Sequence, residues 1–311
     1  MLDPDRPDPV IDQHSYREHL LALNGLIQRR DSAWAREKSA QMIGAILAGR
    51  TPHKYPDHIL SGRFIEALIR NYEITGNPDA LRLAKRYAES HIDNVTAEDG
   101  EIPLEKGHTH SYLGTLRGLL LYGEISKQQR YVDRVLKTYQ NGVTEKLIKK
   151  TGFTSHEIET QNGEDASSGD VAQLALWLAT RHGQLDLLDD VERIVRARLL
   201  PSQVITAPPI KPRNDGKTGP VFDLTSRPDH KIVATADAFR ALNERIIGGY
   251  GGCHPRPHGW KTVTQDVTAA IIHTLVDIYQ HIVVREENGL RILFHFDYAD
   301  DDIEITSVRN K

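Results

Sequence analysis

Histidines and carboxylates gather in a few segments of this sequence, and both side-chain types can bind sugar hydroxyls or move protons. The segments cover residues 55–58, 107–110, 156–170 and 253–266. An indole within the last segment adds an apolar face on which a pyranose ring can lie, and the whole set is typical of a carbohydrate site. The candidate catalytic residues are Glu157, Glu159, Glu164, Asp170 and Asp266. The candidate substrate-binding residues are Asp57, His108, His110, His254, Arg256, His258 and Trp260.

The carboxylates favour hydrolysis of a glycosidic bond by general acid/base catalysis. This reaction uses a protonated carboxyl group and a carboxylate, about 6.5–9.5 Å apart in inverting enzymes and about 5 Å apart in retaining ones. Glu157 or Glu159 is the candidate acid, and because the two alternate along an extended stretch we expect only one to face inward. Glu164, Asp170 or Asp266 is the candidate partner. Crowding of these acids is expected to raise the pKa of one of them.

The same residues also have structural interpretations. Asp170 lies three residues after Ser167, which is the spacing of a capping box. Asp266 falls in the first turn of an expected helix, where the helix dipole favours a carboxylate. His108 and His110 could form a metal pair, but a lone H-x-H motif is weak evidence. We expect these histidines to be hydrogen-bonding groups, with no bound metal and no cofactor.

Helical periodicity extends from Ser15 to about Ile282, and it predicts the elements that position these segments. In each expected pair the first helix is the more apolar, so the first helices should form an inner ring and the second helices an outer one. The fold expected is therefore all-α, an α/α toroid of at least nine helices. Ser61, Ser111 and Ser168 are the expected N-caps of three inner helices. The expected pairs are 16–30 with 34–48, 61–75 with 79–92, 111–125 with 128–147 and 168–181 with 185–199, followed by a helix at 265–283.

The sequence predicts three parts: an extended N-terminal arm (residues 1–14), a toroid domain (15–285) and a β-rich tail (286–311). Three prolines among the first nine residues exclude a helix from the arm. A long loop is expected at 201–236, and long irregular loops in a compact domain are usually functional. The tail alternates at 290–296 and 303–308, which predicts a short closing hairpin. A β-domain supplied by a partner chain and a homo-oligomer both remain open.

Composition excludes several classes of partner. The formal net charge is −4 and the basic residues are dispersed, so no nucleic-acid or membrane partner is expected. The single cysteine, Cys253, excludes an intramolecular disulfide and a thiolate zinc cluster. The first nine residues are acidic and lack the apolar core of a signal peptide. This predicts a cytoplasmic protein as the chain stands, or a periplasmic or secreted one if a leader has been removed.

Several motifs, in chain order, are similar to those of one enzyme family. They are SGRFIEAL with TGN, GHTHSYLGTLRGLLLY, E-x(5)-D before LALWLA, DDVERIVRARLLPSQ and LRILFHF, and they span roughly residues 57–310. Together they resemble the bacterial β-L-arabinofuranosidase family of glycoside hydrolases, including relatives from polysaccharide-degrading bacteria. The resemblance implies an α/α toroid with β-structure after it and exo-acting hydrolysis of a glycoside. It also implies an acid/base role for Glu157 or Glu159 and sugar binding by His108, with His110 alongside.

The zinc and cysteine chemistry of that family does not carry over to this chain. The family holds zinc with a Glu-x-Cys pair and two adjacent cysteines, one of which is the nucleophile. The matching positions here are Glu164-Asp165-Ala166 and Thr262-Val263, so Glu164 is kept and no thiolate is. The resemblance therefore implies a divergent member with a different catalytic apparatus.

Two other functions remain open on the same fold. A polysaccharide lyase would use a histidine or tyrosine to remove the proton next to a uronate carboxylate, and Arg256 or Lys261 could neutralise that carboxylate. A non-catalytic carbohydrate-binding protein derived from an enzyme is the other possibility. A lyase would release an unsaturated product that absorbs ultraviolet light, whereas a binding protein would show affinity without turnover.

Overall fold

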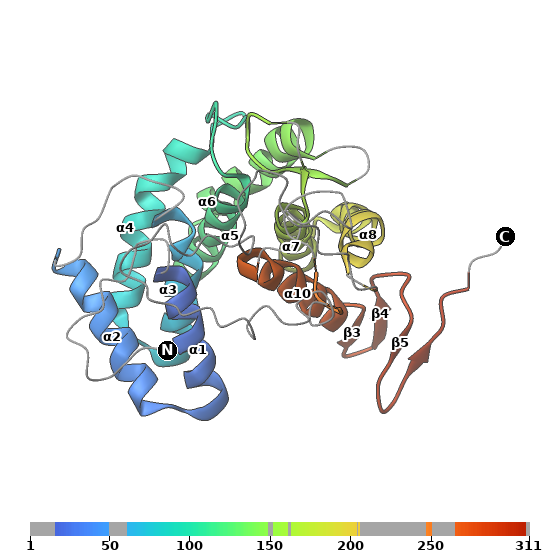
Figure 1. Cartoon of the computed structure of the whole chain (residues 1–311), viewed down its shortest axis with the longest axis horizontal. Helices are drawn as coiled ribbons and strands as arrows, with labels where there is room; N and C mark the ends of the chain where they lie inside the picture. The colour runs from blue at the N-terminus through green and yellow to red at the C-terminus, as the bar shows by residue number, and fades with distance from the viewer. Residues whose placement is uncertain are drawn as a thin grey trace, which may run out of the picture.

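The computed structural model describes residues 16–49, 61–148, 152–160, 163–203, 205, 247–250 and 265–308 (Figure 1). Within these ranges the chain has nine α-helices, which confirms the prediction of an all-α fold. Two π-helices, Tyr139–Leu147 and Val195–Leu199, continue α6 and α8. The α-helices are α1 (Tyr16–Arg30), α2 (Ala33–Leu47), α3 (Phe64–Thr75), α4 (Pro78–Val95), α5 (Thr109–Ser126), α6 (Gln129–Thr138), α7 (Asp165–His182), α8 (Leu188–Ile194) and α10 (Gln265–Gln280).

The helices form an inner and an outer layer, as an α/α toroid requires. The inner helices α1, α3, α5, α7 and α10 pack against one another in that order, while α2, α4, α6 and α8 each pack behind the inner helix that precedes them (Figure 1). Helices α5 and α7 are buried on all sides from Thr109 to Gly123 and from Asp165 to Ala179. A helix buried all round belongs to the interior of a fold. The N-terminal ends of these two helices consequently meet at one rim.

The inner helices do not begin at the predicted serine caps. The residues at the N-cap positions of α3, α5 and α7 are Arg63, His108 and Glu164. Ser111 lies inside the first turn of α5, where its hydroxyl contacts the His108 ring at 2.9 Å. The prediction of serine caps was wrong. Contacts between distant segments, described below, place the N-caps of α5 and α7 three and four residues before Ser111 and Ser168.

Close approach of two inner helices depends on Gly118 of α5. A Cβ added at Gly118 would lie 2.7 Å from the Cβ of Ile65 and 3.2 Å from the backbone nitrogen of Glu66 in α3. We expect Gly118→Ala to lower the free energy of unfolding by about 1–3 kcal/mol, because α3 and α5 must separate to admit the methyl group. This loss should outweigh the gain of up to about 1 kcal/mol in helix propensity. Denaturant unfolding measures the difference.

Gly44 in α2 is the matched control, since an added Cβ there meets nothing within 4 Å. Gly44→Ala should leave stability unchanged or raise it by up to about 1 kcal/mol through helix propensity alone. Equal effects of the two substitutions would contradict the close packing of α3 on α5.

The C-terminal segment forms two small antiparallel hairpins. β3 (Val283–Glu286) pairs with β4 (Gly289–Ile292), and β5 (Tyr298–Ala299) pairs with β6 (Glu304–Ile305). A closing hairpin is therefore confirmed, but pairing of 290–296 with 303–308 is wrong. A two-residue turn at 287–288 pairs β4 with the strand before it, which is the shortest hairpin connection. None of the described helices is both long and apolar enough to cross a membrane.

Candidate active site

Short backbone pairings bring three of the predicted segments together at the rim. β1 (Thr154–Ser155) pairs with β2 (Gly163–Glu164), which leads directly into α7. The stretch between these strands crosses the start of α5, where the Ile158 amide donates to the Gly107 carbonyl at 2.8 Å and the Thr109 amide donates to the His156 carbonyl at 3.3 Å. The resulting group of side chains is called the rim cluster here. It consists of His108, His110, His156, Glu157, Glu164 and Asp170.

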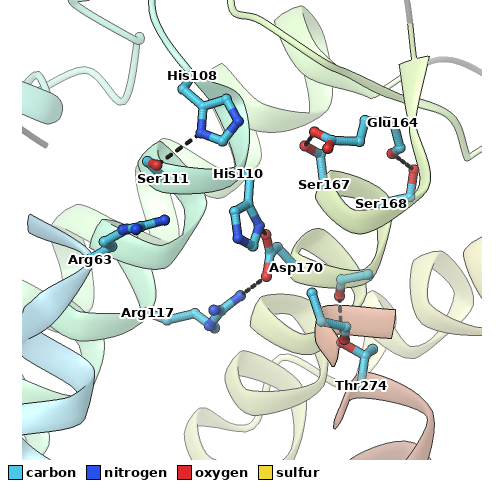
Figure 2. A network of polar contacts seen from close by, with 12 residues as sticks. Arg63, His108, His110, Ser111, Arg117, Glu164, Ser167, Ser168, Asp170 and Thr274 are labelled. Carbon is cyan, nitrogen blue, oxygen red and sulfur yellow. Dashed lines mark hydrogen bonds and ion pairs between the residues drawn. The ribbon is translucent and has the colours of Figure 1, made fainter. Parts of the chain in front are cut away.

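Asp170 is 1% exposed and is held between the Arg117 guanidinium and the His110 ring. Its carboxylate accepts hydrogen bonds from Arg117 Nη1 and from His110 Nδ1 (Figure 2). Burial alone would raise the pKa of this carboxyl, but the neighbouring Arg117 and His110 hold it well below its usual range. Asp170 is therefore an ionised partner of His110 and Arg117. The capping-box interpretation is also wrong, since Glu164 occupies the N-cap of α7.

Arg117 connects this pair to the inner helix α3. The guanidinium is 1% exposed, and its Nε lies 3.3 Å from Glu66 Oε2. Burial disfavours the charge on Arg117, yet the carboxylates of Asp170 and Glu66 outweigh burial and raise its pKa. Burial opposes ionisation of Glu66, but Arg117 together with Arg17 and other positive neighbours lowers its pKa. Glu66, Arg117 and Asp170 thus form a charge network inside the ring.

Glu164 is fully buried and has His156 as its partner. Its Oε2 accepts a hydrogen bond from Ser167 at 2.8 Å and lies 3.3 Å from His156 Nδ1, an ion-pair contact outside hydrogen-bond geometry. Burial opposes ionisation of Glu164, but His156, His110 and Ser167 lower its pKa. The same carboxylate raises the pKa of His156. The ionised form of Glu164 and the protonated form of His156 therefore stabilise each other.

Glu157 and Glu159 have different environments although they are two residues apart. Glu157 has a side chain that is 29% exposed, and its Oε1 lies 3.3 Å from His156 Nε2. Burial raises the pKa of Glu157, and the charges of Glu159 and Glu164 add to this effect while His156 opposes it. Glu159 is exposed and accepts a hydrogen bond of 3.0 Å from the Gly107 amide, which lowers its pKa. Of the two, Glu157 keeps its proton to higher pH.

The imidazoles of the rim cluster contact one another edge to face. The His108 ring centre lies 5.7 Å from that of His110 and 5.9 Å from that of His156. Burial and the neighbouring His110 lower the pKa of His108 to about 4, so His108 is neutral at neutral pH. Among the described residues no group of three histidine, cysteine or carboxylate side chains is arranged to hold a metal ion.

Glu66 and Arg117 take part in the charge network, although neither was among the residues predicted for the site. Each interrupts an apolar stretch, in RFIEALI and YLGTLRGLLLY. Charged side chains are almost never fully buried unless they are paired. Two opposite charges on the inner helices could therefore have been recognised as buried partners.

The other predicted residues lie outside the described part of the chain. They are Asp57, His254, Arg256, His258 and Trp260. Asp266 lies in the first turn of α10, but its side chain is likewise outside the described part.

No family model and no curated protein matches this chain. Solved structures do match its fold. An α-1,6-mannanase, GH76A, from Salegentibacter sp. HEL1_6 superposes with a TM-score of 0.51 and 14% identity over 59% of this chain and 60% of the mannanase. The unsaturated glucuronyl hydrolase of Bacillus sp. GL1 gives a TM-score of 0.51 and 14% identity over 62% of this chain and 59% of that enzyme.

A GH127 β-arabinofuranosidase also matches, with a TM-score of 0.50 and 14% identity over 62% of this chain. This chain spans only 34% of the arabinofuranosidase, and about three fifths of the other two enzymes. Identities this low relate the chain to these enzymes by fold alone. The chain thus has the α/α-toroid fold seen in several carbohydrate-processing enzymes.

Proposed function

We propose that this protein is a glycoside hydrolase in which Glu157 is the general acid. The observation that carries the proposal is the environment of Glu157. Its carboxyl group reaches solvent at the rim, and burial raises its pKa. A general acid needs both access to the substrate and a proton that is still bound at the working pH. Glu157 donates this proton to the glycosidic oxygen as the bond from that oxygen to the anomeric carbon breaks.

Glu164 and Asp170 were predicted as the second carboxylate that works with the general acid. In this proposal they instead pair with histidines. Glu164 is 0% exposed and Asp170 is 1% exposed, so neither carboxylate reaches a bound sugar in the described conformation. Each instead faces one imidazole of the rim cluster, His156 and His110 respectively. Asp266 stays a candidate for a second carboxylate that touches the substrate.

A carbohydrate ligand is supported by two independent lines. The rim cluster presents imidazoles and one accessible carboxyl group, the side chains that commonly bind sugar hydroxyls. The sequence motifs resemble the β-L-arabinofuranosidase family, and toroids of similar fold carry the names of enzymes that act on glycosides. We therefore propose a divergent relative of that family, with an oligosaccharide or polysaccharide of plant or microbial origin as substrate. His108 and His110 would contact that sugar.

The test is to incubate the purified chain with a panel of plant and microbial oligosaccharides and to identify the products. Release of a reducing sugar without new ultraviolet absorbance supports hydrolysis. An unsaturated product that absorbs in the ultraviolet would assign the protein to the lyases. Binding of an oligosaccharide without turnover would contradict an enzymatic role altogether.

A further inference from the structure

A continuous chain of buried polar contacts ends on one ring nitrogen of His110. Glu66 contacts Arg117 Nε. Arg117 Nη1 donates to one oxygen of Asp170, and His110 Nδ1 contacts the other oxygen (Figure 2). The three charged residues come from α3, α5 and α7, so the packing of three inner helices holds the chain in place. This arrangement fixes the orientation of the His110 ring.

The ionised carboxylate also determines the tautomer of His110. A carboxylate can only accept hydrogen bonds, so the Nδ1 atom that faces it must carry the proton. In the neutral ring the proton is then absent from Nε2, and this nitrogen is a proton acceptor. His110 is 8% exposed, and its Nε2 has no hydrogen-bond partner among the described residues. Figure 2 shows the ring at the rim, between His108 and Asp170.

The other two imidazoles of the rim cluster lack this combination of a fixed tautomer and a ring nitrogen without a hydrogen-bond partner. His156 lies between two carboxylates, with Nδ1 at 3.3 Å from Glu164 and Nε2 at 3.3 Å from Glu157, and this environment favours its protonated form. His108 Nδ1 faces the hydroxyl of Ser111, which can donate or accept and therefore leaves the tautomer open. Within the cluster, His110 alone combines a fixed tautomer with an unpartnered nitrogen.

We propose that His110 Nε2 is the general base of the reaction and that Asp170 and Arg117 are positioning residues for it. The proposal rests on the proposed hydrolase function. Nε2 takes a proton from a water molecule, and the electron pair left on the water oxygen forms the new bond to the anomeric carbon. The bond from that carbon to the glycosidic oxygen breaks, and the oxygen takes the proton of Glu157. Water attacks directly, so the anomeric configuration inverts.

The tautomer is tested without any substrate, by nitrogen NMR of the full-length chain labelled at histidine and kept at mildly alkaline pH. Loss of one set of ring signals in His110→Gln assigns His110 among the 15 histidines. In the wild type we expect the proton on Nδ1 and a bare Nε2. In Asp170→Asn we expect the proton to move to Nε2, because an amide can donate to Nδ1. A wild-type ring protonated on Nε2 would overturn the proposal.

Glu66→Gln is the matched control, because it removes the other partner of Arg117 and leaves Asp170 in place. Both variants lose one buried carboxylate, so thermal melts of the two report the cost of that loss to the fold. The His110 tautomer should remain wild type in Glu66→Gln. If both variants change the tautomer, or neither does, Asp170 does not position the ring.

The catalytic part of the proposal is tested on an oligosaccharide that the wild type cleaves. Asp170→Asn should lower kcat by about 10²–10⁴-fold, the usual contribution of a general base, with KM little changed. The same substitution of the aspartate behind the catalytic histidine of serine proteases lowers kcat by about 10⁴-fold through the wrong tautomer. Full kcat in Asp170→Asn, or retention of configuration, would overturn the base assignment.

Failure of the proposed hydrolase function can be distinguished from failure of the positioning role. If the wild type cleaves no glycoside, the base role falls with the proposed function, whereas the NMR comparison still decides whether Asp170 and Arg117 position His110.

Discussion

Glu157→Gln is expected to lower kcat by about 10²–10⁴-fold, the range for loss of a general acid. The amide keeps the shape of the side chain and removes the proton that the leaving oxygen needs. Glu157 is partly exposed, so the fold should survive the substitution. The measurement is steady-state cleavage of an oligosaccharide substrate by both proteins, accompanied by thermal melts. Loss of turnover with an unchanged melting temperature is the expected result.

Glu159→Gln provides the matched control, since Glu159 has the same chemistry but is exposed and bound to the Gly107 amide. It should retain most of the wild-type turnover. The pH profile separates the two residues further. The wild type should lose activity as pH rises through the raised pKa of Glu157, because the acid must be protonated to act. The pH profile of Glu157→Gln should not show this loss of activity at alkaline pH. Equal turnover in Glu157→Gln and wild type would place the acid elsewhere, with Asp266 the next candidate.

Arg117→Met is expected to lower the free energy of unfolding by about 3–5 kcal/mol, the usual cost of removing one partner of a buried ion pair. The substitution keeps an apolar side chain of similar length but leaves Glu66 and Asp170 as buried carboxylates without their shared cation. Equilibrium unfolding in denaturant at neutral pH measures the change.

Arg82→Met is the control for loss of a surface charge. Arg82 is 65% exposed and pairs with Asp79 at 3.1 Å, so its replacement should cost less than about 1 kcal/mol. The pH dependence gives a second check. The pKa values of Glu66 and Asp170 are lowered in the folded protein, so their pairing stabilises it at neutral pH and loses this effect as pH falls through those pKa values. The stability difference between wild type and Arg117→Met should therefore shrink in acid. A constant difference would contradict a charge-based origin.

The sequence alone was sufficient to predict the helical fold. Apolar residues recur at helical spacing over most of the chain, and the first helix of each pair is the more apolar. This local pattern predicted inner and outer helices, because a helix with little polar surface must be buried. The same reasoning located the rim, where the segments before α5 and α7 carry histidines and carboxylates.

The roles of the individual carboxylates depend on tertiary structure. Asp170 and His110 are 60 residues apart in sequence, and Asp170 and Arg117 are 53 apart. No local pattern distinguishes Asp170, which is buried between Arg117 and His110, from Glu157, which reaches solvent. Burial and the nearest charges decide which carboxyl group keeps its proton, and both are set by how α3, α5 and α7 pack.

The helix boundaries at the rim were also decided by long-range contacts. Serine side chains are good caps by local preference, yet α5 and α7 begin at Thr109 and Asp165. The backbone of 154–158 pairs with that of 107–109 and 163–164, and this pairing ends where the helices start. Local propensity was overridden because several hydrogen bonds between distant segments outweigh one side-chain cap. The sequence by itself determined which segments carry the histidines and carboxylates of the rim cluster, and the packing of the inner helices determined the burial and the charged neighbours of each.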